Sequence, residues 1–180
     1  MNLNLSFEKI NPNDDLQARA YMSWYNDPVM IDNWTLQKEE ETVINYSLED
    51  FKNQFAEKEG APKKYAFMVK LDGNYIGYGQ FYINHMMCMT KAERVCWPSI
   101  AIGNSEFRGK GFGLLVCNEI LRMAQILNCT HIEAGVFEFN KRMKLLLVEN
   151  GFSFIGRQER KTFVENKWWA SEHYLLELVP

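Results

Sequence analysis

The stretch "EFRGKGFG" (residues 106–113) places three glycines and two cations between a strand-like run, "VCWPSIAIG", and a helix-like run, "LLVCNEILRMAQIL". A strand that turns into a helix creates an anion site, because the first helical N–H groups lack intrahelical partners and the helix dipole puts partial positive charge there. Glycine adopts unusual φ values and lets the backbone approach a ligand closely. The turn therefore predicts a strand–helix unit that binds an anionic ligand at the junction.

Two common phosphate-binding loops do not fit this stretch. A Walker A loop requires Lys and Ser or Thr after its last glycine, and two leucines follow here. A Rossmann fingerprint requires a third glycine, which would fall on Leu114 or Val116 depending on the frame. The spacing that does fit is R-x-x-G-x-G, at Arg108, Gly111 and Gly113.

Hydrophobic periodicity predicts the element order β-α-α-β-β-β-α-β-α-β-β, a mixed sheet with helices packed on it. Asp72-Gly73 predicts a tight hairpin, and Ser47 with Asp50 predicts a capped helix that ends before Gly60. The segment "VMIDNWTLQKEEETVINY" after Asp27-Pro28 is predicted to be irregular. Pro98 cannot donate to a ladder, so its strand is predicted to have an edge or a bulge there.

Composition favours one soluble domain spanning residues 1–180, since a chain of this length can bury a core of its own. The net charge of −3 gives no basic footprint for nucleic acid. No apolar run reaches the length of a membrane span, and the first residues do not resemble a secretion signal. The four cysteines lack zinc-type spacing, so we expect buried reduced thiols, no metal and a cytoplasmic location.

The R-x-x-G-x-G loop resembles the pyrophosphate loop of the GNAT acetyltransferase superfamily. "NKRMKLLLVENGF" is similar to that family's second motif, and "TFVENKWWASEHYLLEL" to its closing hairpin, especially in ribosomal-protein N-terminal acetyltransferases. The resemblance implies an α/β fold: a mixed, largely antiparallel sheet, splayed at a cofactor slot and flanked by about four helices. It also implies acetyl-CoA as the cofactor.

By this resemblance, backbone N–H groups of residues 110–113 hold the pyrophosphate and the backbone near Ile100 pairs with the pantetheine arm. Asn140 is read as a helix N-cap, a cofactor contact, or both. Arg142 and Lys144 are either solvated or close to the nucleotide phosphates. The cofactor-binding residues implied are Ile100, Ala101, Ile102, Arg108, Gly109, Lys110, Gly111, Phe112, Gly113 and Asn140.

Acetyl transfer to an amine requires a proton acceptor, because an amine with a pKa near 10 is neutral only about one part in a thousand at pH 7. Glu93 and Glu138, at strand ends, are the candidate catalytic carboxylates, although either could be a plain surface charge. An N–H near Ile100 is the expected oxyanion donor. The family often has a Tyr in its second motif that protonates the thiolate, and Leu147 occupies that position here.

The acceptor is expected near Trp34, Asp32 and Tyr82, where aromatic and acidic side chains suit a cationic amine; a solvated loop is the alternative for the first two. The sequence thus predicts an N-acetyltransferase acting on a small molecule or peptide amine in a ternary complex, with a homodimer left open. Two alternatives stay open. "DGNYIGYGQFY" and "SWYNDPVMIDNW" also resemble aminoglycoside 6'-N-acetyltransferases, and the chain could be a non-catalytic acyl-CoA sensor.

Overall fold

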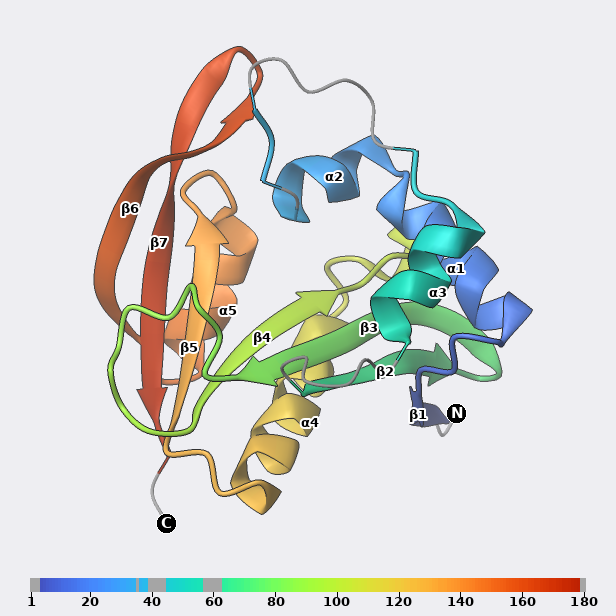
Figure 1. Cartoon of the computed structure of the whole chain (residues 1–180), viewed down its shortest axis with the longest axis horizontal. Helices are drawn as coiled ribbons and strands as arrows, with labels where there is room; N and C mark the ends of the chain where they lie inside the picture. Colours follow the sequence, from blue (N-terminus) through green and yellow to red (C-terminus); the bar gives the residue numbers. More distant parts are fainter. Residues whose placement is uncertain (1–3, 35, 39–44, 57–62, 179–180) are drawn as a thin grey trace.

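The computed structural model describes residues 4–34, 36–38, 45–56 and 63–178. Their core is one seven-stranded sheet in the order β1-β2-β3-β4-β5-β7-β6 (Figure 1). All neighbouring strands are antiparallel except β4 and β5, which are parallel, so the predicted mixed and largely antiparallel sheet is confirmed. The strands are β1 (Leu5–Lys9), β2 (Lys64–Leu71), β3 (Asn74–Ile83), β4 (Val95–Ala101), β5 (His131–Phe137), β6 (Ser153–Val164) and β7 (Lys167–Glu177).

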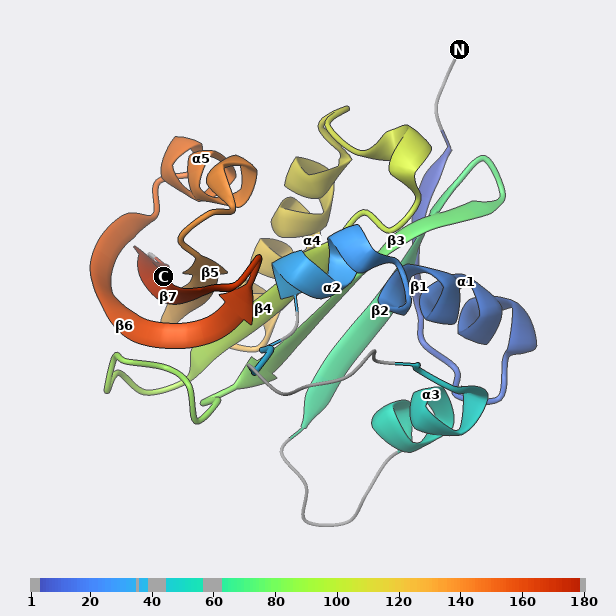
Figure 2. The same cartoon turned by 90° about the horizontal axis from the view of Figure 1, so that it is seen from above.

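Helices cover both faces of the sheet (Figure 2). Helices α4 (Phe112–Ile126) and α5 (Lys141–Glu149) lie on one face, where they enclose the main hydrophobic core. On the other face lie α1 (Asp15–Tyr25), α2 (Pro28–Trp34) and α3 (Leu48–Phe55), which share a second core with the sheet. A short 3-10 turn, Ser105–Phe107, precedes α4.

The sequence missed α2, because the segment after Pro28 was predicted to be irregular. Proline is well placed at the first position of a helix, where its fixed φ is already helical and its missing N–H costs nothing. Asp27 precedes it, and its Oδ1 accepts the Val29 N–H at 3.0 Å. The Asp-Pro pair therefore ends α1 and also starts the next helix, so the described helices number five rather than about four.

Several local predictions are confirmed. Asp72 and Gly73 have φ values of +46° and +85° and join β2 to β3. Ser47 and Asp50 form the capping box of α3, which ends at Phe55, while Gly60 lies outside the described residues. The cysteines carry free thiols, and all but Cys88 are buried. None of the described helices combines the length and apolarity needed to cross a membrane.

The β4–β5 pairing is very short. Only Val95 with His131 and Cys96 with Ile132 are paired, after which the two strands diverge (Figure 1). We call the stretch where they no longer pair, residues 97–101 of β4 and 133–137 of β5, the β4–β5 split. The bulge expected at Pro98 is wrong for the β3 side, where the register runs without a shift. The split arises because β4 simply stops pairing with β5, next to a residue that has no N–H to donate.

Close backbone approach beside the split gives a stability prediction. A Cβ on Gly77 of β3 would overlap the carbonyl oxygen of Ala101 and lie 3.1 Å from the Ile102 Cα, so the backbone itself would have to move. Gly77→Ala is expected to lower the free energy of unfolding by about 1–3 kcal/mol. Urea denaturation measures this. Asn74→Ala, at an exposed position of the same strand, is the control and should stay within about 0.5 kcal/mol of wild type. Equal stability of the two variants would contradict the prediction.

Candidate active site

The glycine loop at the start of α4 has the backbone that an anion site requires. Gly109 and Gly111 have φ values of +75° and +85°, in the left-handed region that other residues rarely adopt. Gly111 is the N-cap of α4 and supplies no side-chain cap. A Cβ there would meet nothing within 4 Å, so glycine is needed at this position for its conformation and not for lack of space.

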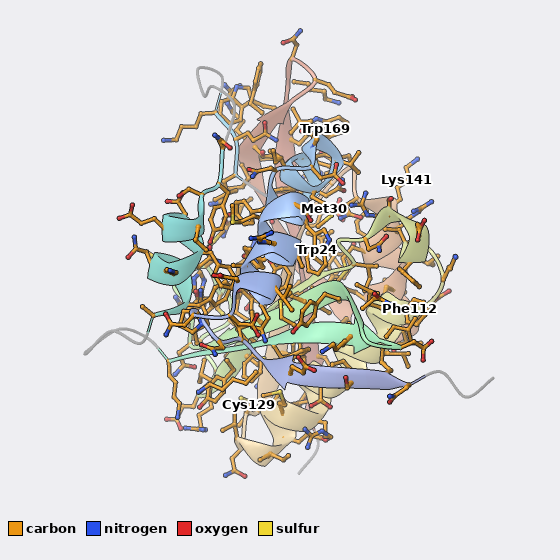
Figure 3. The ribbon with its side chains drawn as sticks, turned by 90° about the vertical axis from the view of Figure 1, so that its right-hand side faces the viewer. Trp24, Met30, Phe112, Cys129, Lys141 and Trp169 are labelled. Carbon is orange, nitrogen blue, oxygen red and sulfur yellow. The ribbon has the colours of Figure 1, made fainter. Side chains whose placement is uncertain are left out.

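The first N–H groups of α4 are available to a ligand. Among the described residues, no hydrogen bond is made by the N–H groups of residues 110–113. Cationic side chains surround them, since Lys110 is in the loop and the Arg142 guanidinium would lie 3.8 Å from a Cβ on Gly109. Figure 3 shows that Phe112 and Lys141, the first residues of α4 and α5, lie on the same side of the molecule. The start of α5 and its Arg142 thus lie on the same side of the molecule as the free N–H groups of α4.

Arg108 is engaged inside the protein. Its Nε donates to the Ile102 carbonyl at 3.0 Å, and its Nη2 donates to the Gly103 carbonyl at 2.5 Å and to Asp27 Oδ2 at 2.6 Å. The hydrogen bond from Arg108 holds the pKa of Asp27 below its usual range. Arg108 thus fixes the chain between β4 and the loop and ties it to the start of α2. We read it as a positioning residue rather than a direct phosphate ligand.

Two backbone positions on β4 face the split, and only one of them has an N–H to donate. The Val95 carbonyl accepts from the Asn84 N–H, on the β3 side. Because backbone directions alternate along a strand, Trp97, Ser99 and Ala101 also point toward β3, whereas Pro98 and Ile100 point into the split.

The three predicted pantetheine contacts on this strand therefore differ. Ile100 presents both its N–H and its C=O to the split, whereas Ala101 faces β3 and the Ile102 carbonyl is used by Arg108.

Glu138 and Asn140 lie at the same end of the split as the glycine loop, because β4 and β5 are parallel. The Glu138 N–H donates to the Ala170 carbonyl at 3.0 Å, and its carboxylate lies 3.6 Å from Arg157. Asn140 is the N-cap of α5, and its Oδ1 accepts the Met143 N–H at 3.1 Å. The N-cap role is confirmed, and a cofactor contact remains a prediction.

Glu93 is not brought to the split. It is exposed in the connection that precedes β4, and its carbonyl accepts from the Thr130 hydroxyl. At that end of β4 there is no gap between the strands, since Val95 and Cys96 still pair with β5. Val95 and Ala101 are six strand steps of roughly 3.3 Å apart, so Glu93 lies on the order of 20 Å or more from the loop end. The structure therefore does not support Glu93 as a catalytic residue.

The acceptor residues predicted from the sequence come from α2 and β3. Asp32 of α2 accepts a hydrogen bond from the Gln37 side chain at 3.0 Å. Tyr82 pairs in register with Trp97, and burial raises its pKa. Trp34 ends α2, but its side chain and the acidic residues 39–41 lie outside the described part of the chain.

Helix α2 spans from the glycine-loop side to the β6–β7 hairpin. Figure 3 shows Trp24, Met30 and Trp169 following one another from α1 through α2 to β7. Beyond α2, the Gln37 N–H donates to Thr162 Oγ1 at 3.0 Å, and the Gln37 carbonyl accepts the Phe163 N–H at 2.9 Å. This helix therefore lies over the face of the sheet that Trp97 and Tyr82 share.

Sequence reasoning missed a buried acid–histidine pair. His173 Nδ1 lies 2.8 Å from Glu133 Oε1, and both side chains are 0% exposed. Glu133 also accepts the backbone N–H groups of Met89 at 2.6 Å and Thr90 at 2.9 Å. A signal was present in "HIEAGVFEF", because alternation places Glu133 on the opposite face from the apolar residues Ile132, Ala134 and Val136 of that strand.

Leu147, where the family often has Tyr, is 1% exposed and belongs to the main core. It offers a hydrocarbon side chain and no proton. If the thiolate is protonated by a group on the protein, that group comes from another element.

Comparisons with known proteins agree with this geometry. The model of the acetyltransferase (GNAT) family matches residues 22–152, well over half of the chain. No curated protein sequence gave a significant match.

Solved structures give the same fold. Spermidine N-acetyltransferase from Vibrio cholerae, in complex with CoA and spermine, is 20% identical with a TM-score of 0.75, covering 96% of this chain and 95% of that one. YncA from Salmonella typhimurium, with its cofactor acetyl-CoA, is 16% identical with a TM-score of 0.71, covering 98% and 94%. A GNAT-family acetyltransferase from Streptococcus pneumoniae is 17% identical with a TM-score of 0.70, covering 97% and 100%.

The Arg108–Asp27 pair predicts a pH-dependent contribution to stability. Because the pKa of Asp27 is lowered in the folded protein, its contribution is complete above the unfolded value of about 4 and is lost as the pH falls through the lower folded value. Asp27→Asn should therefore be less stable than wild type at pH 7, and the difference should shrink below about pH 4. Urea denaturation at both pH values measures it. Asp32→Asn, on the helix that Asp27 precedes, is the control, and an identical pH response of the two variants would contradict this role.

Proposed function

The chain belongs to the GNAT acetyltransferase family, and we propose that it moves an acetyl group from acetyl-CoA to a primary amine of a small molecule or peptide. The observation that carries this proposal is the position of the glycine loop beside the β4–β5 split. Free N–H groups of α4 lie at the end where β4 and β5 have parted, and Ile100 presents an unpaired backbone N–H and C=O between them. A long ligand with a diphosphate at one end fits this arrangement.

The residues present fit coenzyme A on structural grounds. The left-handed glycines leave open space at the helix start, and Lys110 and Arg142 add positive charge around it. An extended arm along β4 can exchange hydrogen bonds with Ile100, which faces the split and, unlike Pro98, has an N–H to donate. With the diphosphate at the loop, the other end of the arm points toward Trp97 and Pro98, where the strands begin to separate.

The chain's own groups have defined roles in the proposed transfer. Acetyl-CoA supplies an activated thioester carbonyl. In this proposal the Ile100 N–H stabilises the negative charge that develops on the carbonyl oxygen in the split. The acceptor amine must lose a proton, and of the two carboxylates expected from the sequence only Glu138 lies at the split. Direct attack in a ternary complex requires both substrates together, and α2 covers the face from which an acceptor would approach Trp97.

A compact cationic amine is the acceptor class that we favour. The Vibrio cholerae structure named above is a spermidine N-acetyltransferase solved with spermine, and this chain has the same fold. Asp32 supplies a carboxylate on α2, and Tyr82 and Trp97 supply aromatic surface on the sheet below. These groups suit a cation through charge and cation–π attraction.

Position 113 tests the cofactor site with two matched variants. A Cβ on Gly113 would lie 3.4 Å from Leu146 Cδ1, a flexible contact, so Gly113→Ala should keep acetyl-CoA affinity within about threefold. Gly113→Asp places negative charge at the helix N-terminus where the diphosphate is proposed to bind, and should weaken binding at least tenfold, about 1.4 kcal/mol. Calorimetry measures both affinities. A folded Gly113→Asp variant with unchanged affinity would exclude this site.

An amine panel tests the transfer itself. Thiol release from acetyl-CoA should require an amine, and polyamines should react faster than aminoglycosides or peptides with free N-termini. Faster reaction with an aminoglycoside would instead favour the antibiotic-modifying alternative. Tight acetyl-CoA binding with no release for any amine class would contradict the proposed function and leave a binding role.

A further inference from the structure

We propose that His173, oriented by Glu133, is the proton acceptor for the amine, in place of the carboxylates expected from the sequence. This inference deepens the proposed function and rests on it. It starts from a buried polar atom: His173 Nε2 has no hydrogen-bond partner among the described residues although the side chain is fully buried. Buried polar atoms nearly always have a partner, so a nitrogen left open at this point is expected to have a use.

Glu133 fixes which nitrogen carries the hydrogen. Its two oxygens accept the Met89 and Thr90 N–H groups, so the side chain acts as an acceptor toward every donor around it. His173 Nδ1 lies 2.8 Å from the same carboxyl group, and an acceptor there requires Nδ1 to donate. The neutral ring therefore has its lone pair on Nε2. When Nε2 takes up a proton, the buried carboxylate stabilises the resulting cation, as in other acid–histidine pairs.

The pair lies where the proposed reaction takes place. Glu133 is the first β5 residue beyond the last β4–β5 pair, so it sits at the vertex of the split. His173 is opposite Gly135 in register, one strand spacing (about 4.8 Å) from the β5 backbone. A Cβ on Gly135 would lie 2.6 Å from the Trp97 ring, and that ring is centred 5.6 Å from the His173 ring. Gly135, the edge of the Trp97 indole and the Ser171 hydroxyl, 3.3 Å from the same Cβ position, therefore lie beside His173 on the side of the split.

Glu138 is less well placed for the same role. It follows Glu133 by five strand positions of roughly 3.3 Å, so it lies toward the glycine loop, about 16 Å from the vertex. Its carboxylate is also 3.6 Å from the Arg157 guanidinium, and a proton taken up there would weaken that attraction.

The proton balance is simple. Nε2 accepts one proton from the ammonium form of the acceptor, directly or through one water molecule, which leaves a neutral amine with a free lone pair. After the new C–N bond forms and the C–S bond breaks, the second amine proton neutralises the thiolate. His173 then returns its proton to solvent.

Other titratable groups face the same region and must be controlled. His85 stacks on Trp97 with ring centroids 5.7 Å apart, and burial lowers its pKa. Cys88 and Lys91 lie in the same connection as His85, and burial together with Glu133 raises the pKa of Cys88 to about 11. Of these, His85 is the group whose titration could be mistaken for that of His173.

The test uses matched asparagine substitutions. Asparagine can replace the Nδ1 donor of His173 but not its Nε2, so His173→Asn keeps the bond to Glu133 and removes only the proton acceptor. We expect kcat/KM to fall by about 10²–10⁴-fold, with unfolding and acetyl-CoA affinity close to wild type and with loss of the acid limb of the pH profile. His85→Asn, the matched control, should change kcat/KM by less than threefold. Wild-type kcat/KM and an unchanged profile in His173→Asn would overturn the proposal.

A second readout does not depend on turnover. Nitrogen-15 spectra of histidine-labelled protein, assigned with His173→Asn, should show the Nδ1–H tautomer at His173 and reversible proton uptake at Nε2 as the pH falls. An Nε2–H tautomer, or a ring that never takes up a proton, would overturn the proposal. If no amine is acetylated, the proposed function fails, and these spectra still decide whether His173 can accept a proton.

Discussion

The candidate site depends on a hydrogen-bond ladder that ends early. β4 and β5 pair at two positions and then separate, which leaves backbone groups of a central strand without a strand partner. In the interior of a sheet such groups would be costly, so a ligand that can exchange hydrogen bonds with them is favoured. The parallel direction of the two strands places their free ends beside the N-termini of α4 and α5. One interrupted ladder thus fixes where the anion, the extended arm and the reacting end of a substrate can lie.

The sequence predicted the parts of this arrangement that are encoded locally. The glycines of the loop, the Asp72-Gly73 hairpin and the Asn140 cap each depend on a few consecutive residues with special backbone or capping preferences. The element order followed from periodicity, with the exception of α2. There the same Asp-Pro pair that ends one helix also begins the next. A rule that treats proline only as a helix terminator does not predict the second helix.

The parts that the sequence could not predict are contacts between distant segments. Glu133 and His173 are forty residues apart and meet only because β5 and β7 are neighbours. Arg108 was expected to bind the cofactor as part of the R-x-x-G-x-G loop, but its guanidinium is taken by two carbonyls and Asp27. Glu93 was chosen because it is close to Pro98 in sequence, whereas the paired start of β4 keeps it away from the split. In each case the sequence showed which chemical group a side chain carries, but not which distant residue it contacts in the fold.

Helix α2 has a mechanical consequence. One end is bound to the glycine-loop side through Asp27 and Arg108, and the chain beyond its other end is bound to β6 through Gln37. Together with the sheet, these contacts link the β4 side of the split to the β6–β7 side. Moving the two halves of the sheet apart at the split would have to break the ion pair or the contacts with β6, so these contacts oppose widening of the split. A site proposed in the split is therefore held in shape before a ligand binds, which lowers the ordering entropy lost on binding.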